Sequence, residues 1–388
     1  MSSWKKVRLG DYIHEYSKRN KDNANIPVYS VTNINGFCTE YFSKEVASKD
    51  KTTYKIVKKG FFAYNPSRIN VGSVDWLRDM DRVIVSPLYN VFFVDSALDQ
   101  QYLYYYLKCP VGLFYIKELA SGSVRDNLKF SILSDFIIPF PDLTIQKDIA
   151  ATLDRIVQII NICNTILDKI DLLVKSRFVE MFGDPNTNSM GWECCELGDC
   201  LESIDNGKSY VCDNYCRTGD NPAILKLSAV TYGVYNPDEN KAMIDEDLFD
   251  ESSEVKDSDL LFTRKNTPDL VGMSAYVFST PPKLMMPDLI FRLNVKSTCN
   301  KKYLWKLINH DLFRPLIQNI ANGSAKSMSN ISKERLSKLT IPVPPLTLQK
   351  QFADFVAQTD KSKYCLVGEQ ILGKAEMLIK ILKQEYFG

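Results

Sequence analysis

Two nearly identical stretches mark the same point in two successive halves of the chain: IPFPDLTIQK at residues 138–147 and IPVPPLTLQK at residues 341–350. Each stretch ends a region of short apolar runs and opens a long run without proline. Proline is common at the entry to a helix and disfavoured inside one. In both halves the stretch therefore predicts the end of a globular region and the start of a long helix.

Further short matches flank these stretches in the same order in both halves. The offset between matching residues grows from 188, between Trp4 and Trp192, to 205, between Gly183 and Gly388. An ordered series with so long a period indicates two duplicated domains rather than a solenoid. The matches pair Trp4 and Leu9-Gly10-Asp11 with Trp192 and Leu197-Gly198-Asp199, Val71-Gly72 with Val271-Gly272, Pro87 with Pro287, Tyr102-Leu103 with Tyr303-Leu304, Gly122-Ser123 with Gly323-Ser324, and Phe182-Gly183 with Phe387-Gly388.

The repeat predicts four segments. Short runs rich in Val, Ile, Tyr and Phe, punctuated by Gly, Pro and Asn, indicate strands in each globular part. One helical segment is expected late in each globule, near 99–119 and 300–320. The fold class is therefore α+β, with two similar globular domains and two long helices. The predicted boundaries are 1–143 for the first globule, 144–184 for its helix, 185–346 for the second globule and 347–388 for its helix.

The first long helix carries an apolar seam. Apolar residues recur at alternating steps of four and three, which is the a/d pattern of a coiled coil. Only Arg177 interrupts this pattern, and Phe178 follows it directly. The second helix starts the same way, but two extra residues near 367–371 predict a stutter in its register. Because exposure of either apolar seam to water is unfavourable, the two helices are expected to pair as an antiparallel intramolecular coiled coil.

Composition excludes several classes of protein. The chain has 388 residues, 45% of them hydrophobic, and a net charge of +1. It has no apolar run long enough to span a membrane and no signal-like start, so a cytoplasmic protein without a membrane partner is expected. The balanced charge argues against a wholly basic nucleic-acid coat but permits local DNA-binding patches. The ten cysteines lack paired C-x2-C spacing, which favours plain reduced thiols over a zinc site.

The sequence offers little catalytic chemistry. Its two histidines, His14 and His310, stand at non-equivalent positions of the repeat, and no phosphate-binding P-loop is present. Asp238, Glu254 and Lys256 fit a loose Mg²⁺-nuclease pattern, but they lie in or near an acidic run and have no counterpart in the first half. A solvated acidic face is favoured there over a nuclease, and the chain is expected to be no enzyme.

Two loop segments recur in corresponding places and suggest contact with DNA. The segments 64–70 and 262–267 follow apolar runs and combine Arg with Asn and Ser or Thr, which suit base edges and phosphates. The segments 121–125 and 322–327 combine Gly and Ser with a basic residue, which suits a phosphate. An ordinary solvated loop is the alternative for any single segment. The predicted DNA-binding residues are Asn65, Ser67, Arg68, Asn70, Ser123 and Arg125 in the first half, and Thr263, Arg264, Lys265, Asn266, Ser324 and Lys326 in the second.

The whole pattern resembles the specificity (S) subunit of a Type I restriction–modification enzyme. The resemblance rests on the Leu-Gly-Asp openings, the repeated Ile-Pro-x-Pro-x-Leu-x2-Gln-Lys stretches and the long helices, the first of which ends at residues 178–185. Residues 26–32 and 224–228 also stand where such subunits carry an early strand.

The resemblance implies that DNA recognition and catalysis belong to different subunits. Each globule would be a target recognition domain that reads one part of a bipartite sequence in double-stranded DNA. The helices would set the gap between the two parts and dock two methyltransferase (modification) subunits, and restriction/translocase subunits would join the complex. The chain itself would hold no cofactor, because S-adenosylmethionine, ATP and Mg²⁺ would be bound by the partner subunits. The alternative from another class is a two-headed protein-interaction scaffold that does not bind DNA.

Overall fold

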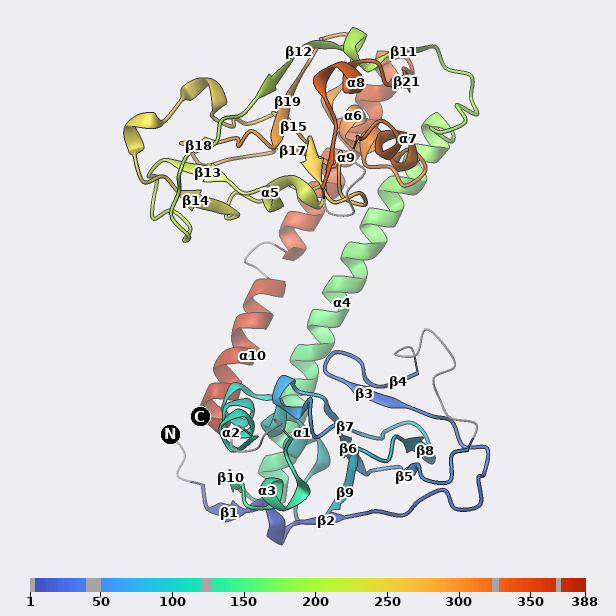
Figure 1. Ribbon diagram of the computed structural model, residues 1–388, viewed down its shortest axis with the longest axis vertical. Helices are drawn as coiled ribbons and strands as arrows, with labels where there is room; N and C mark the ends of the chain where they lie inside the picture. Colours follow the sequence, from blue (N-terminus) through green and yellow to red (C-terminus); the bar gives the residue numbers. More distant parts are fainter. Residues whose placement is uncertain (1–3, 40–49, 121–126, 323–327, 368–370) are drawn as a thin grey trace. The chain divides into compact units, whose positions relative to one another are not determined.

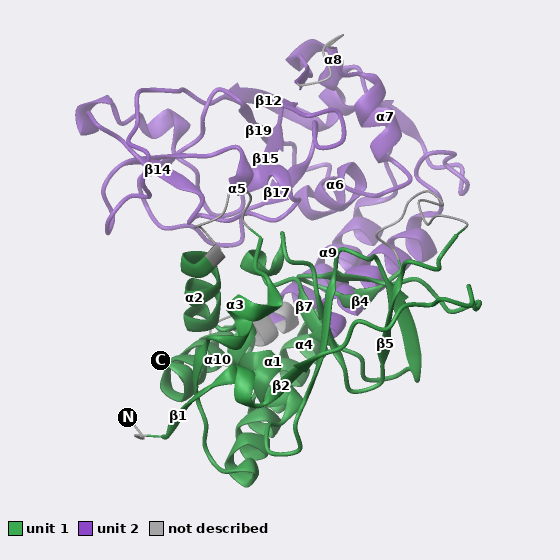
Figure 2. Cartoon of the chain, turned by 60° about the horizontal axis from the view of Figure 1, so that its bottom comes forward, with its two compact units in different colours: residues 1–164, 366–388 green, residues 165–365 purple. Residues whose placement is uncertain are grey.

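The computed structural model describes residues 4–39, 50–120, 127–322, 328–367 and 371–388, with only the backbone of residues 120 and 362–367. The chain divides into two compact units (Figure 2). Unit 1 contains residues 1–164 and 366–388, and unit 2 contains residues 165–365. None of the helices in the described part of the chain is long and apolar enough to cross a membrane.

Unit 1 is built around a four-stranded antiparallel sheet in the order β2-β9-β6-β7, formed by Ile13–Glu15, Asn90–Val94, Phe62–Tyr64 and Val74–Trp76. Three smaller antiparallel pairs accompany it. They are β1 (Lys6–Arg8) with β10 (Ile137–Pro139), β3 (Ser30–Thr32) with β4 (Gly36–Cys38), and β5 (Lys55–Lys58) with β8 (Arg82–Val85). The helices are α1 (Gln100–Lys108), α2 (Pro110–Ala120), α3 (Phe130–Ser134) and α10 (Leu372–Phe387), with short 3-10 turns η1 (Leu9–Asp11) and η2 (Ile69–Val71).

Unit 2 repeats this plan with a four-stranded sheet in the order β12-β19-β15-β17, formed by Leu201–Asn206, Ile290–Val295, Leu260–Thr263 and Ser274–Tyr276. The other sheets are β11 (Cys194–Glu196) with β21 (Thr340–Pro342), β16 (Lys265–Asn266) with β20 (Ser329–Asn330), and β14 (Asn240–Ala242), β13 (Ala223–Leu225) and β18 (Leu284–Met285). The helices are α5 (Ser228–Thr231), α6 (Lys301–Ile308), α7 (Arg314–Asn319), α8 (Lys333–Ser337) and α9 (Leu346–Val367), with 3-10 turns η3 (Leu197–Cys200), η4 (Glu246–Leu248) and η5 (Glu251–Ser253).

The two units share their framework, so the predicted α+β fold with two similar globular halves is confirmed. The four-stranded sheets have the same strand order, and in each unit the strand before the Leu-Gly-Asp turn pairs with the strand that carries Ile-Pro. The late helical segment differs from the prediction, because each unit has two helices there instead of one. In unit 1, proline accounts for the break: it disfavours helical backbone at the preceding residue, and Cys109 before Pro110 is extended with ψ 160°.

The glutamine of the repeated stretch explains why that stretch recurs. Gln146 is fully buried, accepts a hydrogen bond from the Asp99 amide at 2.8 Å and donates to the carbonyls of Ala97 and Pro141. Gln349 does the same in unit 2, where it accepts from the Asn300 amide at 2.9 Å and donates to Pro344. Each glutamine therefore joins the start of a long helix to the start of α1 or α6. A buried amide that satisfies backbone groups in this way is costly to replace.

The first long helix, α4, runs from Leu143 to Phe182 and belongs to both units. Its predicted apolar seam is buried or half-buried at every position, including Phe178 beside the half-buried Arg177. The second long helix is described as α9 and α10, and the predicted stutter falls on residues 368–370, which lie outside the described residues. The predicted four-segment boundaries remain a prediction.

Each globule takes the start of one long helix and the end of the other into its core. In unit 1, Ile149 and Leu153 of α4 share the core with Phe387, whose ring lies 5.4 Å from that of Tyr102. In unit 2, Phe352 of α9 packs with Phe182 at the end of α4, and the Phe182 ring lies 5.0 Å from that of Tyr303. Within each unit the start of one helix thus meets the end of the other, as an antiparallel arrangement requires. Figure 1 shows α10 beside α1 and α2 of unit 1.

Candidate nucleic-acid interface

The first predicted loop follows β6 in unit 1 and leads into β7. Asn65 folds it locally: its Oδ1 atom accepts from the Ser67 amide at 3.1 Å, and its carbonyl accepts from the amides of Arg68 and Ile69 at 2.9 Å. Ile69 is fully buried and anchors the loop to the core. Ser67 and Arg68 remain exposed, and Asn70 is half-buried. The loop is therefore held by Asn65 and Ile69 and presents Arg68 outward.

The corresponding loop of unit 2 follows β15 and is more strongly tied to the protein. The Thr263 hydroxyl is fully buried and accepts from the Met273 amide at 2.9 Å. Asn266 is also buried and donates from Nδ2 to the Thr231 hydroxyl at 3.0 Å. These two predicted residues shape the loop, whereas Lys265 is exposed.

Arg264 is half-buried and has a defined place in this loop. Its guanidinium lies 5.0 Å from the centre of the Phe291 ring and donates to Asn330 Oδ1 at 3.3 Å. Stacking on an aromatic ring fixes the plane of a guanidinium while leaving its outer N–H groups available. Among the described residues, none of the ion pairs involves Arg68, Arg264 or Lys265. Both loops thus carry cations without a carboxylate partner.

The repeated Val-Gly match sits at the end of each loop and has a steric cause. Gly72 and Gly272 adopt φ values of +89° and +76°, which only glycine adopts at low cost. A Cβ atom at Gly72 would lie 2.6 Å from Asn33 Oδ1, and one at Gly272 would lie 2.2 Å from Ile317 Cγ2. Glycine is needed at both positions so that the loop can turn back against its neighbour.

In each half, described residues that flank the second predicted segment contact the first loop. Ser123 and Arg125, and likewise Ser324 and Lys326, lie outside the described residues. In unit 1, the Leu128 amide donates to the Pro66 carbonyl at 3.1 Å. In unit 2, Asn330 exchanges backbone hydrogen bonds with Asn322 and pairs with Lys265. In both units, a residue that follows the second segment therefore bonds to the first loop.

The sequence did not indicate two residues that hold the loop after β15 in unit 2. Arg314 is buried in α7 and donates to the carbonyls of Gly272 and Val271 at 2.8 and 2.6 Å. Asn330 orients Arg264, as described above. Because Arg314 has no repeated motif around it, the search for recurrence gave no signal for it.

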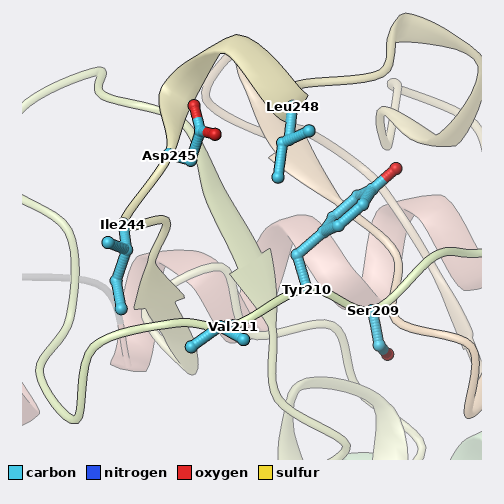
Figure 3. Close-up of a pocket in the computed structure, with 6 residues that line it drawn as sticks. All are labelled: Ser209, Tyr210, Val211, Ile244, Asp245 and Leu248. Atoms are coloured by element: carbon cyan, nitrogen blue, oxygen red, sulfur yellow. The ribbon is translucent and has the colours of Figure 1, made fainter.

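The acidic run 245–259 is partly neutralised and carries no metal-binding geometry among the described residues. Asp250 accepts from Lys208 at 2.7 Å, and this contact lowers the pKa of its carboxyl group. Asp259 pairs with Arg292 at 2.9 Å, and Glu254 accepts from the Lys283 amide. A shallow apolar hollow adjoins this run (Figure 3). None of the loop residues lines the hollow, whose walls are Ser209, Tyr210, Val211, Ile244, Asp245 and Leu248.

Comparison with known proteins agrees with this duplicated geometry. The family model for the Type I restriction modification DNA specificity domain matches residues 1–172 and again 190–372. The chain belongs to this family. The predicted relation to Type I S subunits is thereby confirmed.

Individual relatives cover the chain to different extents. The chain is 30% identical over 187 residues to the Type I restriction enzyme EcoEI specificity subunit of Escherichia coli, a match that covers 47% of the chain and 32% of that relative. It is 22% identical over 376 residues to the Type I restriction enzyme MjaVIII specificity subunit of Methanocaldococcus jannaschii, covering 92% of the chain and 86% of that relative. The crystal structure of the S subunit from M. genitalium superimposes with a TM-score of 0.61 at 13% identity, covering 100% of this chain and 96% of that one. This last likeness concerns the fold alone.

Proposed function

We propose that the chain is the sequence-specific DNA-binding subunit of a Type I restriction–modification complex, in which each unit reads one part of a bipartite target. One observation carries this proposal: each of the two copies of the DNA specificity domain has, after the equivalent strand of its sheet, a loop whose cations form no ion pair among the described residues. A protein that reads two different half-sites needs such a common scaffold with different loop side chains.

The proposal gives each predicted residue a role. Arg68 and Arg264 would contact base edges, since arginine can donate two parallel hydrogen bonds to guanine. Lys265 and Ser67 suit phosphates, which fix the position of a protein on the duplex. Thr263 and Asn266 act by holding the loop, because their side chains are already engaged within unit 2. Asn65 has the same role in unit 1.

The long helices are proposed to dock two modification subunits. Outside its seam, α4 exposes large apolar side chains in both units: Ile159 and Ile162 in unit 1, and Leu172 and Leu173 in unit 2. Leu172 is 63% exposed and Ile162 58%. Apolar side chains on a solvated helix face are typical of a surface that a partner covers. One such patch in each unit fits one modification subunit per unit.

Catalysis is proposed to reside in the partners. The loops of both units carry amides, hydroxyls and cations that suit recognition of bases and phosphates rather than proton transfer. The modification subunits would bind S-adenosylmethionine, and the restriction/translocase subunits would use ATP and Mg²⁺.

The direct test is a binding selection with the full chain and its modification subunits on a duplex library with a randomised centre. We expect a motif of two defined parts separated by a fixed gap. Arg68→Ala and Arg264→Ala should each relax one part only, at a cost of about 1–3 kcal/mol. Arg82→Ala, which removes an exposed arginine from β8, is the matched control. Equal weakening on all sequences would reduce both arginines to phosphate contacts.

The same selection tests whether the helices act as a ruler. Removing one heptad from each long helix shortens it by about 10 Å, which is roughly three base pairs of duplex. We expect the gap to shorten while both half-sequences stay the same. An unchanged gap would show that the helices do not set the spacing. A chain that binds duplex DNA weakly and without dependence on salt would instead favour the protein-interaction scaffold.

A further inference from the structure

A short turn in unit 1 presents side chains that the fold does not use. Residues 33–35, here called the tip, connect β3 and β4, and all three are exposed. Ile34 is 90% exposed. Among the described residues, no hydrogen bond engages the side-chain amides of Asn33 and Asn35. An exposed isoleucine between two free amides adds nothing to the stability of the unit.

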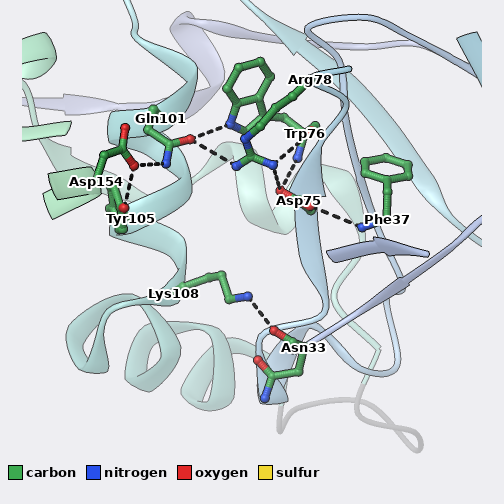
Figure 4. Close-up of polar contacts among 9 residues, drawn as sticks. All are labelled: Asn33, Phe37, Asp75, Trp76, Arg78, Gln101, Tyr105, Lys108 and Asp154. Atoms are coloured by element: carbon green, nitrogen blue, oxygen red, sulfur yellow. Dashed lines mark hydrogen bonds and ion pairs between the residues drawn. The ribbon is translucent and has the colours of Figure 1, made fainter. Parts of the chain in front are cut away.

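The backbone of the tip is nevertheless firmly held. The Thr32 hydroxyl accepts from the Asn35 amide at 3.1 Å, and the Lys108 ammonium at the end of α1 donates to the Asn33 carbonyl at 2.6 Å. Asp75 on β7 accepts from the Phe37 amide at 3.2 Å. Figure 4 shows that the bonds from Lys108 and to Asp75 come from two different elements. The turn is thus fixed from both sides while its side chains stay free.

This support extends to the long helix. Arg78 donates to Asp75 at 2.7 Å and to Gln101 at 3.0 Å, and its guanidinium lies over the rings of Trp76 and Tyr104. Gln101 in turn donates to Asp154 of α4 at 2.7 Å (Figure 4). A continuous polar network therefore connects β4, which directly follows the tip, to α4. Such pre-organisation lowers the entropy that a binding surface loses when it meets its ligand.

The tip lies directly against the predicted DNA-binding loop. Asn33 Oδ1 approaches Gly72 so closely that a Cβ there would lie 2.6 Å away from it, and such a Cβ would lie 3.6 Å from Lys108 Cε. Gly72 ends the short turn that begins one residue after Arg68. The tip and Arg68 therefore belong to neighbouring segments of one surface.

Unit 2 has a segment in the corresponding place with different chemistry. Residues 232–234 follow α5, and Trp305 of α6 donates from its indole to the Gly233 carbonyl at 2.9 Å. The preceding Thr231 bonds to Asn266 of the predicted loop. Tyr232 is 72% exposed. In both units, a late helix thus braces an exposed segment beside the loop, but the presented side chains differ.

We infer that the tip is a second base-reading element of unit 1 and that residues 232–234 are its counterpart in unit 2. The amides of Asn33 and Asn35 suit adenine, which asparagine can bind with two hydrogen bonds, and Ile34 suits the methyl group of thymine. The tip itself has no charge, and the Lys108 ammonium beside it donates one of its hydrogen bonds to the Asn33 carbonyl. The tip therefore contributes sequence preference and little phosphate attraction. This inference rests on the proposed function.

The test uses the full chain with its modification subunits and the same randomised duplex library. In the variant Asn33→Ala, Ile34→Ala, Asn35→Ala, we expect one half of the motif to lose its preference at one to three adjacent base pairs. Affinity for the wild-type sequence should fall about 10–100-fold, with the salt dependence unchanged because no phosphate contact is removed. Ile137→Ala, which removes an exposed isoleucine from β10 of the same unit, should leave the motif intact.

Three single substitutions distinguish direct base contact by the tip from support of its backbone. Lys108→Met should weaken the base preference at the same base pairs without abolishing binding, since it removes one support of the tip backbone. Lys108→Arg should restore this preference. Tyr232→Ala should change only the other half of the motif. An unchanged motif in the triple variant would overturn the inference. A wild-type complex that selects no sequence at all would instead refute the proposed function on which it rests.

Discussion

Replacing Gln146 by leucine removes three hydrogen bonds from a fully buried site while keeping most of the side-chain volume. The Asp99 amide loses its acceptor, and the carbonyls of Ala97 and Pro141 lose a donor. A buried N–H group without a partner costs about 1–3 kcal/mol. The two carbonyls add roughly 0.5–1 kcal/mol each. We therefore expect Gln146→Leu to lower the free energy of unfolding of unit 1 by about 2–5 kcal/mol.

Peptide-resolved hydrogen exchange in increasing urea measures this loss unit by unit. Peptides over α1 should exchange faster in Gln146→Leu, and peptides over α6 should remain protected. Gln349→Leu should show the reverse pattern, because it breaks the equivalent bonds in unit 2. Gln158→Leu, the same substitution at an exposed position of α4, is the matched control and should change stability by less than about 0.5 kcal/mol. If Gln146→Leu behaves like this control, the glutamine does not join the helix to the globule, and the account given for the repeated stretch is wrong.

Two further predictions concern the helix ends. Phe387→Ala should lower the stability of unit 1 by about 3 kcal/mol, and Phe182→Ala should do the same for unit 2, because each ring fills the core of one globule; equal exchange in both units for either variant would contradict this assignment. His310 is buried against Phe178, and burial lowers its pKa, so its neutral form is favoured in the folded state. The unfolded chain then binds more protons as the pH falls below about 6.5, and stability should decrease in that range. Urea midpoints at pH 7.5 and 5.5 should show a smaller difference in His310→Phe, and an equal difference would exclude His310 as the cause.

The repeat was readable from the sequence because its motifs are local physical requirements. Gly72 and Gly272 end loops with positive φ, and the two buried glutamines form hydrogen bonds with backbone groups at the start of α1 and α6. Such positions accept few substitutes, so short identical motifs remain in the two halves. The seam of α4 was readable for a similar reason, since its burial follows directly from the heptad spacing.

The division of each long helix between two globules was not predicted from that spacing. A heptad pattern shows that a helix has a buried face but does not identify what covers each end. The last match of the repeat, Phe182-Gly183 with Phe387-Gly388, marked the relevant residues without showing that each phenylalanine enters a globular core. The split of the late helical segment at Pro110 was a simpler omission, because the proline was visible in the sequence.

The exposure of individual loop side chains could not be predicted from the sequence either. Thr263 and Asn266 have the side chains of DNA-contacting residues, yet both are buried and bonded within unit 2. Lys265 and Asn266 stand next to each other and differ in exposure, because β16 pairs with β20 and a strand turns successive side chains to opposite faces. Pairing of short strands across about 65 residues is set by tertiary contacts that composition does not reveal.

The tip lies outside the repeated motifs. The positions that the two halves share form the framework that both units need. Two units that read different base sequences must differ where they contact bases. The residues that determine their specificity therefore have no match in the repeat. Asn33-Ile34-Asn35 and Tyr232-Gly233-Val234 fit this expectation: the backbone of each is held by a late helix of the framework, and their side chains differ. In a duplicated recognition protein, the places where equivalent supports carry unlike exposed side chains are therefore the first to test for specificity.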